Sequence, residues 1–229
     1  MPSAQQIEID ELATSRSGDF RSLLHAIHSA NISNLSLLHP RGKVLFAEGE
    51  PACGVLILRT GRATVSISSS EGRLVILRIA QPGDVLGLNS VLRNETFNTT
   101  VKTIESCRTD FIPRNDLVDL MERSQPTAHA ISQILSREVA ELTERARSLL
   151  LPQTANARLA RLLLEWSEHS RSIEIHRTFT QDEVAHIICS SRETVTRLLS
   201  SLNRRRIIRV TPDSILISDR AALQKIAAG

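Results

Sequence analysis

Residues 180–202 read TQDEVAHIICSSRETVTRLLSSL, and this stretch decides the fold of the C-terminal part of the chain. Thr180 and Glu183 have the spacing of a capping box, in which a threonine hydroxyl bonds the backbone amide of the glutamate while the glutamate side chain reaches back. The pattern predicts a short helix over 181–188.

Ser190 and Glu193 repeat the capping pattern ten residues later, so we expect a second helix from Arg192. Residues 189–191 must then form a tight turn between the two helices. Two helices joined by a turn of this length are typical of a helix-turn-helix.

The second helix has one apolar and one polar face at about 100° per residue. Its apolar positions are Val195, Leu198, Leu199 and Leu202. Its polar positions are Arg192, Glu193, Thr196, Arg197, Ser200 and Asn203. A polar face is usually only solvated, but the forked guanidinium of arginine can bind guanine O6 and N7, and a glutamate can accept from cytosine N4. A face that only attracted the negative charge of DNA would not carry the acidic Glu193. The combination of arginines and glutamate therefore favours reading of base edges.

A small hairpin is expected after this helix, with strands at 207–210 and 215–217 and a turn at 211–213. It would make the helix pair a winged arrangement. Arg204, Arg205, Arg206 and Arg209 lie beside it. Arginine runs are more often solvated than functional, but next to a reading helix they can contact phosphates.

Short strands dominate residues 44–112, where runs of alternating hydrophobicity are separated by turns that contain glycine. The strands are expected at 55–59, 63–68, 74–79, 98–104 and 108–112. This pattern predicts an antiparallel barrel or sandwich. Weak helical periodicity precedes it over 1–40, at Leu23, Leu24, Ile27 and Ile32.

Helices are expected after the strands, at 117–123 with Asp116 as the cap, at 127–150 and at 156–170, followed by strands at 173–175 and 178–179. The long helix carries an apolar stripe made by Leu135, Val139, Leu142, Ala146 and Leu149. The periodicity alone favours equally a parallel partner helix and packing on the chain's own barrel.

Composition narrows the class of protein. The chain has 229 residues, enough for two domains, with 41% hydrophobic residues. Aromatic residues make up only 3%, without a tyrosine, which disfavours stacking platforms for single-stranded nucleic acid. We expect a cytoplasmic protein without membrane association, because no signal peptide or membrane-length apolar run is visible and Cys53, Cys107 and Cys189 are odd in number and dispersed.

The net charge of +3 is unevenly distributed. Residues 152–229 hold 12 Lys and Arg against 8 Asp and Glu, whereas residues 1–151 hold 16 against 17. The positive excess therefore belongs to the part that contains the predicted helix-turn-helix.

Residues 189–199 and 180–183 closely resemble the winged helix of the cyclic AMP receptor and fumarate-nitrate regulator (CRP/FNR) superfamily of bacterial transcription factors. Gly49-Glu50, residues 54–58, Gly61, the Gly72 turn, residues 82–87 and the long helix occur in the order of that family's sensor barrel and dimer helix. The resemblance covers most of the chain. It implies an α+β fold with a jelly-roll-like antiparallel β-barrel of the cyclic-nucleotide-binding type in residues 1–124, a dimerisation helix in 125–151 and a winged helix-turn-helix in 152–229.

The resemblance also implies roles for residues. Arg192, Glu193 and Arg197 should read base edges in the major groove of double-stranded DNA, and Thr180, Ser191 and Thr194 should bond phosphates, with Arg204 beside them. The stripe on the long helix should then form a homodimer on a palindromic operator. The expected function is that of a dimeric, sequence-specific transcription regulator, with RNA polymerase as a further partner.

The predicted effector pocket departs from the family pattern. Members that bind cyclic AMP have a glutamate after the glycine of the Gly87 turn and an Arg-Ser pair before the following strand, where this chain has Leu88, Phe97 and Asn98. The aligned pocket positions are Leu86, Gly87, Leu88, Phe97, Asn98 and Thr143. Without the cation and the acid, cyclic AMP would leave a charge poorly compensated, so we expect a different effector of unknown identity.

Other readings stay open or are disfavoured. An iron-sulfur cluster needs four thiolates, and the chain has three cysteines. A haem-dependent gas sensor stays open, with His25, His28 and His39 as candidates, and so does a regulator that needs no ligand. An enzyme and a metal site are disfavoured, because nucleophile-elbow, phosphate-loop and zinc motifs are missing from the sequence.

Overall fold

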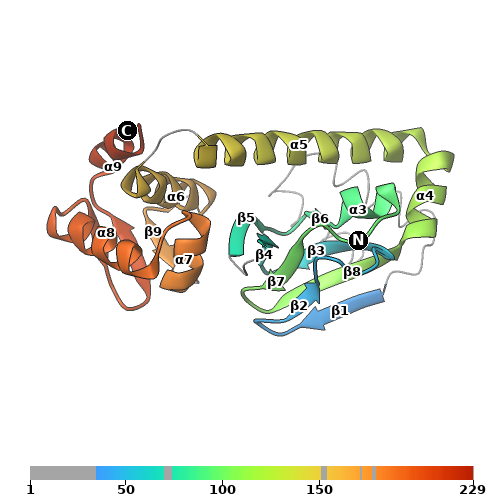
Figure 1. Ribbon diagram of the computed structural model, residues 1–229, viewed down its shortest axis with the longest axis horizontal. Helices are drawn as coiled ribbons and strands as arrows, with labels where there is room; N and C mark the ends of the chain where they lie inside the picture. The colour runs from blue at the N-terminus through green and yellow to red at the C-terminus, as the bar shows by residue number, and fades with distance from the viewer. Residues whose placement is uncertain (1–34, 70–73, 151–153, 171, 177–178, 229) are drawn as a thin grey trace, which may run out of the picture. The chain divides into compact units, whose positions relative to one another are not determined.

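The computed structural model describes residues 35–69, 74–150, 154–170, 172–176 and 179–228 (Figure 1). The chain forms two compact units, of which the first runs to Leu142 and the second begins at Thr143; the short stretch Arg73–Ile76 belongs to the second unit. The apolar positions expected to form an N-terminal helix, Leu23, Leu24, Ile27 and Ile32, lie outside the described residues. Residues 35–39 form a strand, so the helical pattern expected over 1–40 does not extend this far.

The first unit contains two four-stranded sheets, in which the described pairings are antiparallel. One has the order β1 (Leu35–His39), β8 (Cys107–Pro113), β3 (Gly54–Thr60) and β6 (Val85–Leu86). The other has the order β2 (Val44–Phe46), β7 (Thr100–Thr103), β4 (Ala63–Ser68) and β5 (Leu74–Ala80). The predicted antiparallel architecture is confirmed, but the sheets do not close into a barrel.

Three helices follow or interrupt these strands: α3 (Leu88–Arg93), α4 (Arg114–Arg123) and α5 (Gln125–Leu150). The sequence did not predict α3, which is short and lies between two left-handed residues, Gly87 with φ 81° and Asn94 with φ 56°. Helix α4 begins earlier than expected, so Asp116 lies in its first turn and Pro113 takes the N-cap position. The prediction of a long helix up to Leu150 is confirmed.

The core of the first unit joins the sheets to the N-terminal half of α5. Leu58, Leu86 and Ile112 from the strands are at most 1% exposed, and Ile131 and Ile134 of α5 belong to the same apolar cluster. Full burial of such side chains contributes about 1.5–3 kcal/mol each. The first half of α5 is thus part of the core of the first unit.

An ion-pair network also links α5 to the sheets. Nη1 of Arg78 on β5 lies 2.5 Å from Oδ2 of Asp84, and its Nη2 lies 3.1 Å from Oε1 of Glu138 on α5. Asp84 also accepts from the backbone amide of Gln81 at 3.1 Å. Burial raises the pKa of Glu138, although the charge of Arg78 opposes this shift.

The second unit contains the helix pair and the hairpin expected of a winged helix-turn-helix, together with further elements. Its elements are α6 (Ala155–Ser170), β9 (Glu174–His176), α7 (Gln181–Ile187), α8 (Arg192–Arg204), β10 (Ile208–Val210), β11 (Ser214–Ile217) and α9 (Arg220–Ala228). The strands form one antiparallel sheet in the order β10-β11-β9, which confirms the predicted hairpin. The sequence did not predict α9.

One strand expected in the second unit does not form. Phe179 lies in a bend, and Thr178 is outside the described residues. The ring of Phe179 stacks on Trp166 of α6, with centroids 4.7 Å apart and planes at 10°. The apolar character that suggested a strand is explained by this aromatic contact, which fixes the chain on α6 just before α7 begins.

Candidate nucleic-acid interface

The capping box of α7 is confirmed. The Thr180 hydroxyl accepts from the backbone amide of Glu183 at 3.2 Å, and the backbone amide of Thr180 donates to Glu183 Oε2 at 2.7 Å. These bonds satisfy two of the amide donors that a helix leaves open at its N-terminus.

The N-cap of α8 is Ser191, not the predicted Ser190. The Ser191 hydroxyl accepts from the backbone amide of Thr194 at 3.2 Å. Ser190 and Ser191 have the same side chain, so the sequence does not distinguish them as caps. In the structure the backbone amide of Ser190 donates to the carbonyl of Ala185 at 2.9 Å, whereas in a capping box at Ser190 it would donate to Glu193.

Helix α8 has the two faces that its sequence predicts. Val195, Leu199 and Leu202 are buried at 7% exposure or less, and Leu198 is half-buried. The exposed residues of the polar face are Arg192, Glu193, Thr196, Arg197, Ser200 and Asn203. The apolar face anchors α8 to the unit and leaves the polar face open to a partner.

Arg192, Glu193 and Arg197 supply donors and an acceptor on this open face. Hydrogen bonds from the backbone amide of Glu193 itself and from the Ser191 side chain, together with the charge of Arg192, lower the pKa of Glu193. The carboxylate is therefore ionised at neutral pH and acts only as an acceptor. Nη1 of Arg192 lies 3.9 Å from Asp182 on α7, a weak exposed pair that a stronger partner can replace.

The four predicted phosphate contacts occupy three places. Thr180 stands at the N-terminus of α7, Ser191 and Thr194 stand at that of α8, and Arg204 is exposed at the C-terminal end of α8. The Ser191 hydroxyl also donates to Thr194 Oγ1 at 3.1 Å, and the Thr180 hydroxyl donates to Glu183 at 3.0 Å. These hydroxyls thus take part in capping in the structure.

Two polar residues of α8 have structural partners that the sequence did not reveal. The Thr196 hydroxyl donates to Gln181 Oε1 on α7 at 2.6 Å. Asn203 Oδ1 accepts from the backbone amide of Val210 at 3.1 Å and so joins α8 to β10. These partners lie fifteen and seven residues away in the sequence and in other elements, so the periodicity of α8 alone could not predict them.

The predicted effector positions in the first unit are filled largely by apolar packing. Leu86 and Leu88 are 1% exposed and Phe97 is 7% exposed. The ring of Phe97 stacks on Phe46 with centroids 3.8 Å apart, so close to Gly87 that a Cβ there would meet Phe97 Cε1 at 2.5 Å.

The two polar positions of the predicted pocket are both exposed. Asn98 receives a bond from Ser90 Oγ at 3.3 Å and donates its backbone amide to the same oxygen at 3.2 Å. Thr143 lies in the C-terminal part of α5. A cavity of about 540 Å³ lies elsewhere, between residues 51–53, 94–96 and 113–115, and the sequence did not predict it.

The candidate ligands for metal or haem are only partly described. His25 and His28 lie outside the described residues, and Nε2 of His39 is hydrogen-bonded to Thr109 Oγ1 at 2.9 Å. The three cysteines are free thiols, with Cys107 buried. Within the described ranges, no group of three or more His, Cys, Asp or Glu side chains could hold a metal ion, and no helix is long and apolar enough to span a membrane.

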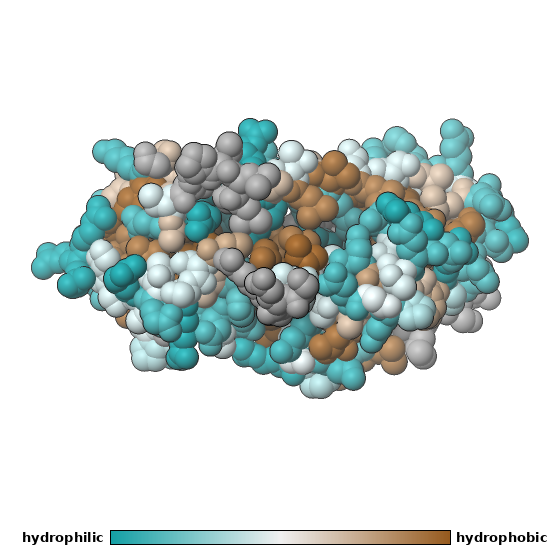
Figure 2. Space-filling view, viewed as in Figure 1, coloured by the Kyte–Doolittle hydropathy of each residue, from teal (hydrophilic) through white to brown (hydrophobic). Residues whose placement is uncertain are grey.

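The stripe on α5 is partly exposed. Val139 is 63% and Leu142 is 45% exposed, Ala146 is also exposed, and Leu135 packs against the core of the first unit. The side chain of Leu149 is outside the described part. Figure 2 shows hydrophobic surface along α5. Periodicity left two functions of the stripe open, and the core contact of Leu135 shows that one edge of it packs on the chain itself.

Comparisons with known proteins agree with this division of the chain. The family model of the cyclic nucleotide-binding domain matches residues 38–124, and that of the Crp-like helix-turn-helix domain matches residues 157–226. A CRP-like cAMP-activated global transcriptional regulator of Mycobacterium tuberculosis is 26% identical over 193 residues, which are 82% of this chain and 86% of that protein. A cyclic AMP receptor protein of Thermus thermophilus is 25% identical over 192 residues, or 84% and 88% of the two chains.

Solved structures share the fold. FixK2 from Bradyrhizobium japonicum superposes with a TM-score of 0.76 at 23% identity and covers 86% of this chain and 99% of its own. The c-di-GMP-responsive global regulator CLP of Xanthomonas campestris gives a TM-score of 0.73 at 19% identity, covering 85% and 98%.

The position of the α8 cap is testable by substitution. We expect Ser191→Ala to lower the free energy of unfolding by about 1 kcal/mol, because the amide of Thr194 loses its acceptor. Ser190→Ala is the matched control and should change it by less than about 0.5 kcal/mol. Urea unfolding followed by circular dichroism measures the free energy of unfolding of both variants. A larger loss in Ser190→Ala than in Ser191→Ala would show that Ser190 is the cap.

Proposed function

Because this chain belongs to the CRP/FNR superfamily of transcriptional regulators, we propose that it acts as a dimeric regulator that reads a palindromic DNA operator with α8. The observation that carries the proposal is the polar face of α8, which is exposed opposite a buried apolar face and joins Arg192, Glu193 and Arg197. The match to the Crp-like helix-turn-helix domain supports it.

The chemistry of that face suits direct readout in the major groove. Arg192 and Arg197 can each donate two bonds to guanine, and the ionised Glu193 can accept from cytosine N4. Thr180, Ser191 and Thr194 at the helix N-termini, with Arg204, contact phosphates and position the helix. RNA polymerase is the further partner in this proposal, and the cytoplasm is its compartment.

Dimerisation occurs through α5 in this proposal. Val139 and Leu142 are the large apolar side chains exposed on the described part of this helix. A second copy of the stripe covers them and removes apolar surface from water. A two-fold symmetric dimer presents two reading helices to successive major grooves about 34 Å apart.

The effector is proposed to be a molecule other than cyclic AMP. Relatives in Mycobacterium tuberculosis and Thermus thermophilus are named for cyclic AMP. Here the positions aligned with the family's nucleotide-binding glutamate and arginine hold Leu88 and Phe97, which are buried. Neither side chain can compensate the cyclic phosphate or bond the ribose hydroxyl.

Base reading can be tested with a duplex selected in vitro from random DNA by the purified wild-type protein. We expect Arg192→Ala and Glu193→Ala each to weaken binding to the selected duplex by about 1–3 kcal/mol and to relax the preference at one position, measured by fluorescence anisotropy. Arg204→Ala should mainly reduce the salt dependence.

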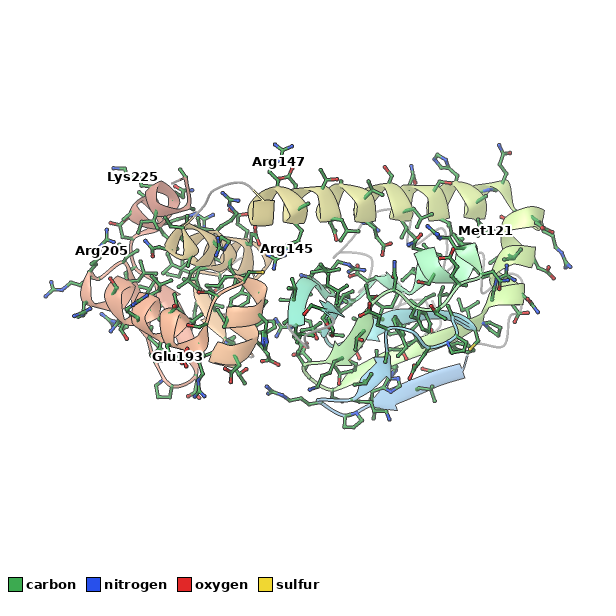
Figure 3. All side chains as sticks on the ribbon, viewed as in Figure 1. Met121, Arg145, Arg147, Glu193, Arg205 and Lys225 are labelled. Atoms are coloured by element: carbon green, nitrogen blue, oxygen red, sulfur yellow. The ribbon has the colours of Figure 1, made fainter. Side chains whose placement is uncertain are left out.

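The matched control is Lys225→Ala on α9, which also removes one positive charge and which Figure 3 shows on the opposite side of the unit from Glu193. Lys225→Ala should bind as the wild type does. Unchanged operator discrimination in both Arg192→Ala and Glu193→Ala would refute base reading by α8.

The dimer can be tested by a charge placed in the stripe. We expect Leu142→Asp to convert the dimer to a monomer in sedimentation equilibrium, because an aspartate buried in an apolar interface is poorly solvated. Ala140→Asp is the matched control, since Ala140 is exposed on another side of α5. A monomeric wild type, or a dimer unaffected by Leu142→Asp, would contradict this interface.

Calorimetric titration with cyclic AMP tests the effector proposal. We expect no binding at submicromolar concentration, because both ligand-compensating side chains are missing. A submicromolar dissociation constant would show that the pocket binds the nucleotide by other groups.

A further inference from the structure

Two arginines from outside the helix pair bond the carboxyl end of α7. The last carbonyl groups of a helix receive no hydrogen bond from that helix, so they need donors from elsewhere. Arg145 donates to the carbonyl of Ile187. Arg158 donates through Nε to the carbonyl of Ile188 at 2.7 Å and through Nη2 to that of Cys189 at 3.4 Å. Three consecutive carbonyls therefore receive arginine donors, and we name Arg145 and Arg158 the arginine clamp.

The clamp holds a strained turn. Cys189 has φ +48°, a left-handed conformation that is unfavourable for a residue with a side chain. Such a conformation persists where the surrounding bonds determine it. Cys189 lies two residues before Ser191, the N-cap of α8. The direction in which α8 leaves the turn therefore depends on how residues 187–189 are held.

Stability alone does not account for Arg145. Its Nε is buried and has no hydrogen-bond partner within the described part of the chain. Burial, together with the charge of Arg158, lowers the pKa of Arg145, although Cys189 and Glu165 oppose this. The same guanidinium donates through Nη2 to the carbonyl of Ile76 at 2.8 Å as well as to that of Ile187. A buried N–H group without an acceptor costs free energy, so the guanidinium is not fully satisfied where it lies. Its cost to the fold indicates a second role.

We propose that Arg145 and Arg158 are positioning residues for DNA reading, which set the orientation of α8 through the carbonyls of residues 187–189. The inference rests on the proposed function. Arg145 extends from the C-terminal end of α5 (Figure 3) and Arg158 comes from α6, so the turn is held from two helices. Base contacts need placement within about 0.5 Å, whereas long side chains reach phosphates over a wider range. Loss of the clamp should therefore affect specific binding and spare non-specific binding.

The first test compares Arg145→Met with Arg147→Met. Arg147 is exposed, lies on the other side of α5 and pairs with Glu144 at 3.6 Å (Figure 3). The probes are the duplex selected by the wild-type protein and a scrambled duplex of the same length, both at one salt concentration. For Arg145→Met we expect about tenfold weaker binding to the selected duplex. Its affinity for the scrambled duplex should be unchanged, because the side chains that contact phosphates are all kept. Arg147→Met should match the wild type.

The second test keeps the positive charge of Arg158 and removes its forked guanidinium group. Arg158→Lys can bond only part of the turn, so we expect about tenfold weaker binding to the selected duplex, with the scrambled duplex unaffected. Arg161→Lys is its control, because Arg161 lies on the same helix and donates to the carbonyl of Ala227 in α9 at 3.2 Å. Both lysine variants should lose similar thermal stability, but only Arg158→Lys should lose discrimination.

The outcomes separate this inference from the proposed function. A wild type with no preference for any selected duplex overturns the proposed function and the inference with it. A wild type that discriminates, with Arg145→Met and Arg158→Lys discriminating equally well, overturns the inference alone. Equal loss of binding to both duplexes together with a lower melting temperature also overturns it, because the arginines would then act only on the fold.

Discussion

The packing of one side of α8 is the constraint on which the second unit depends. Val195, Leu199 and Leu202 are buried, and α8 contacts α6, α7 and β10, while the residues on its opposite side are exposed. Three such side chains supply several kcal/mol of apolar burial, enough to hold a helix whose other face is rich in charge. Because the anchoring residues recur every three or four positions, the polar residues between them are forced onto one surface. The same spacing thus determines the packing and the composition of the open face.

The first unit uses burial differently. In this chain the region beside Gly87 is apolar, with Phe46 stacked on Phe97 and Leu88 in the core. An anionic ligand needs charged or polar donors, and the apolar side chains at these positions supply none. Residues 38–124 match a cyclic nucleotide-binding domain, and the positions beside Gly87 are apolar. The fold by itself therefore does not specify a ligand.

The sequence predicted those elements whose signals are local. The caps of α7, the two faces of α8 and the hairpin after it follow from spacings of two to four residues. Short elements without such signals were missed: α3 spans six residues between two left-handed positions, and β1, β2 and β6 have five residues or fewer. The strand expected at Phe179 failed because a stacking partner in α6 determines that apolar position. The role of Arg158 was invisible for a different reason: its acceptors are backbone carbonyls about thirty residues away, and a carbonyl carries no sequence signature.

The ion pairs of Arg78 have a mechanical consequence for α5. Core packing and the bonds from Arg78 to Asp84 and Glu138 fasten the first half of the helix to the sheets, so this half cannot slide or roll on its own. Val139 is the next residue after Glu138, and it is exposed. Any body that docks on Val139 is therefore held in a fixed register with β5 and the 81–84 turn. A rotation of α5 relative to β5 would have to break the buried ion pairs of Arg78. The exposed surface of α5 at Val139 and the strands therefore move together as one rigid body.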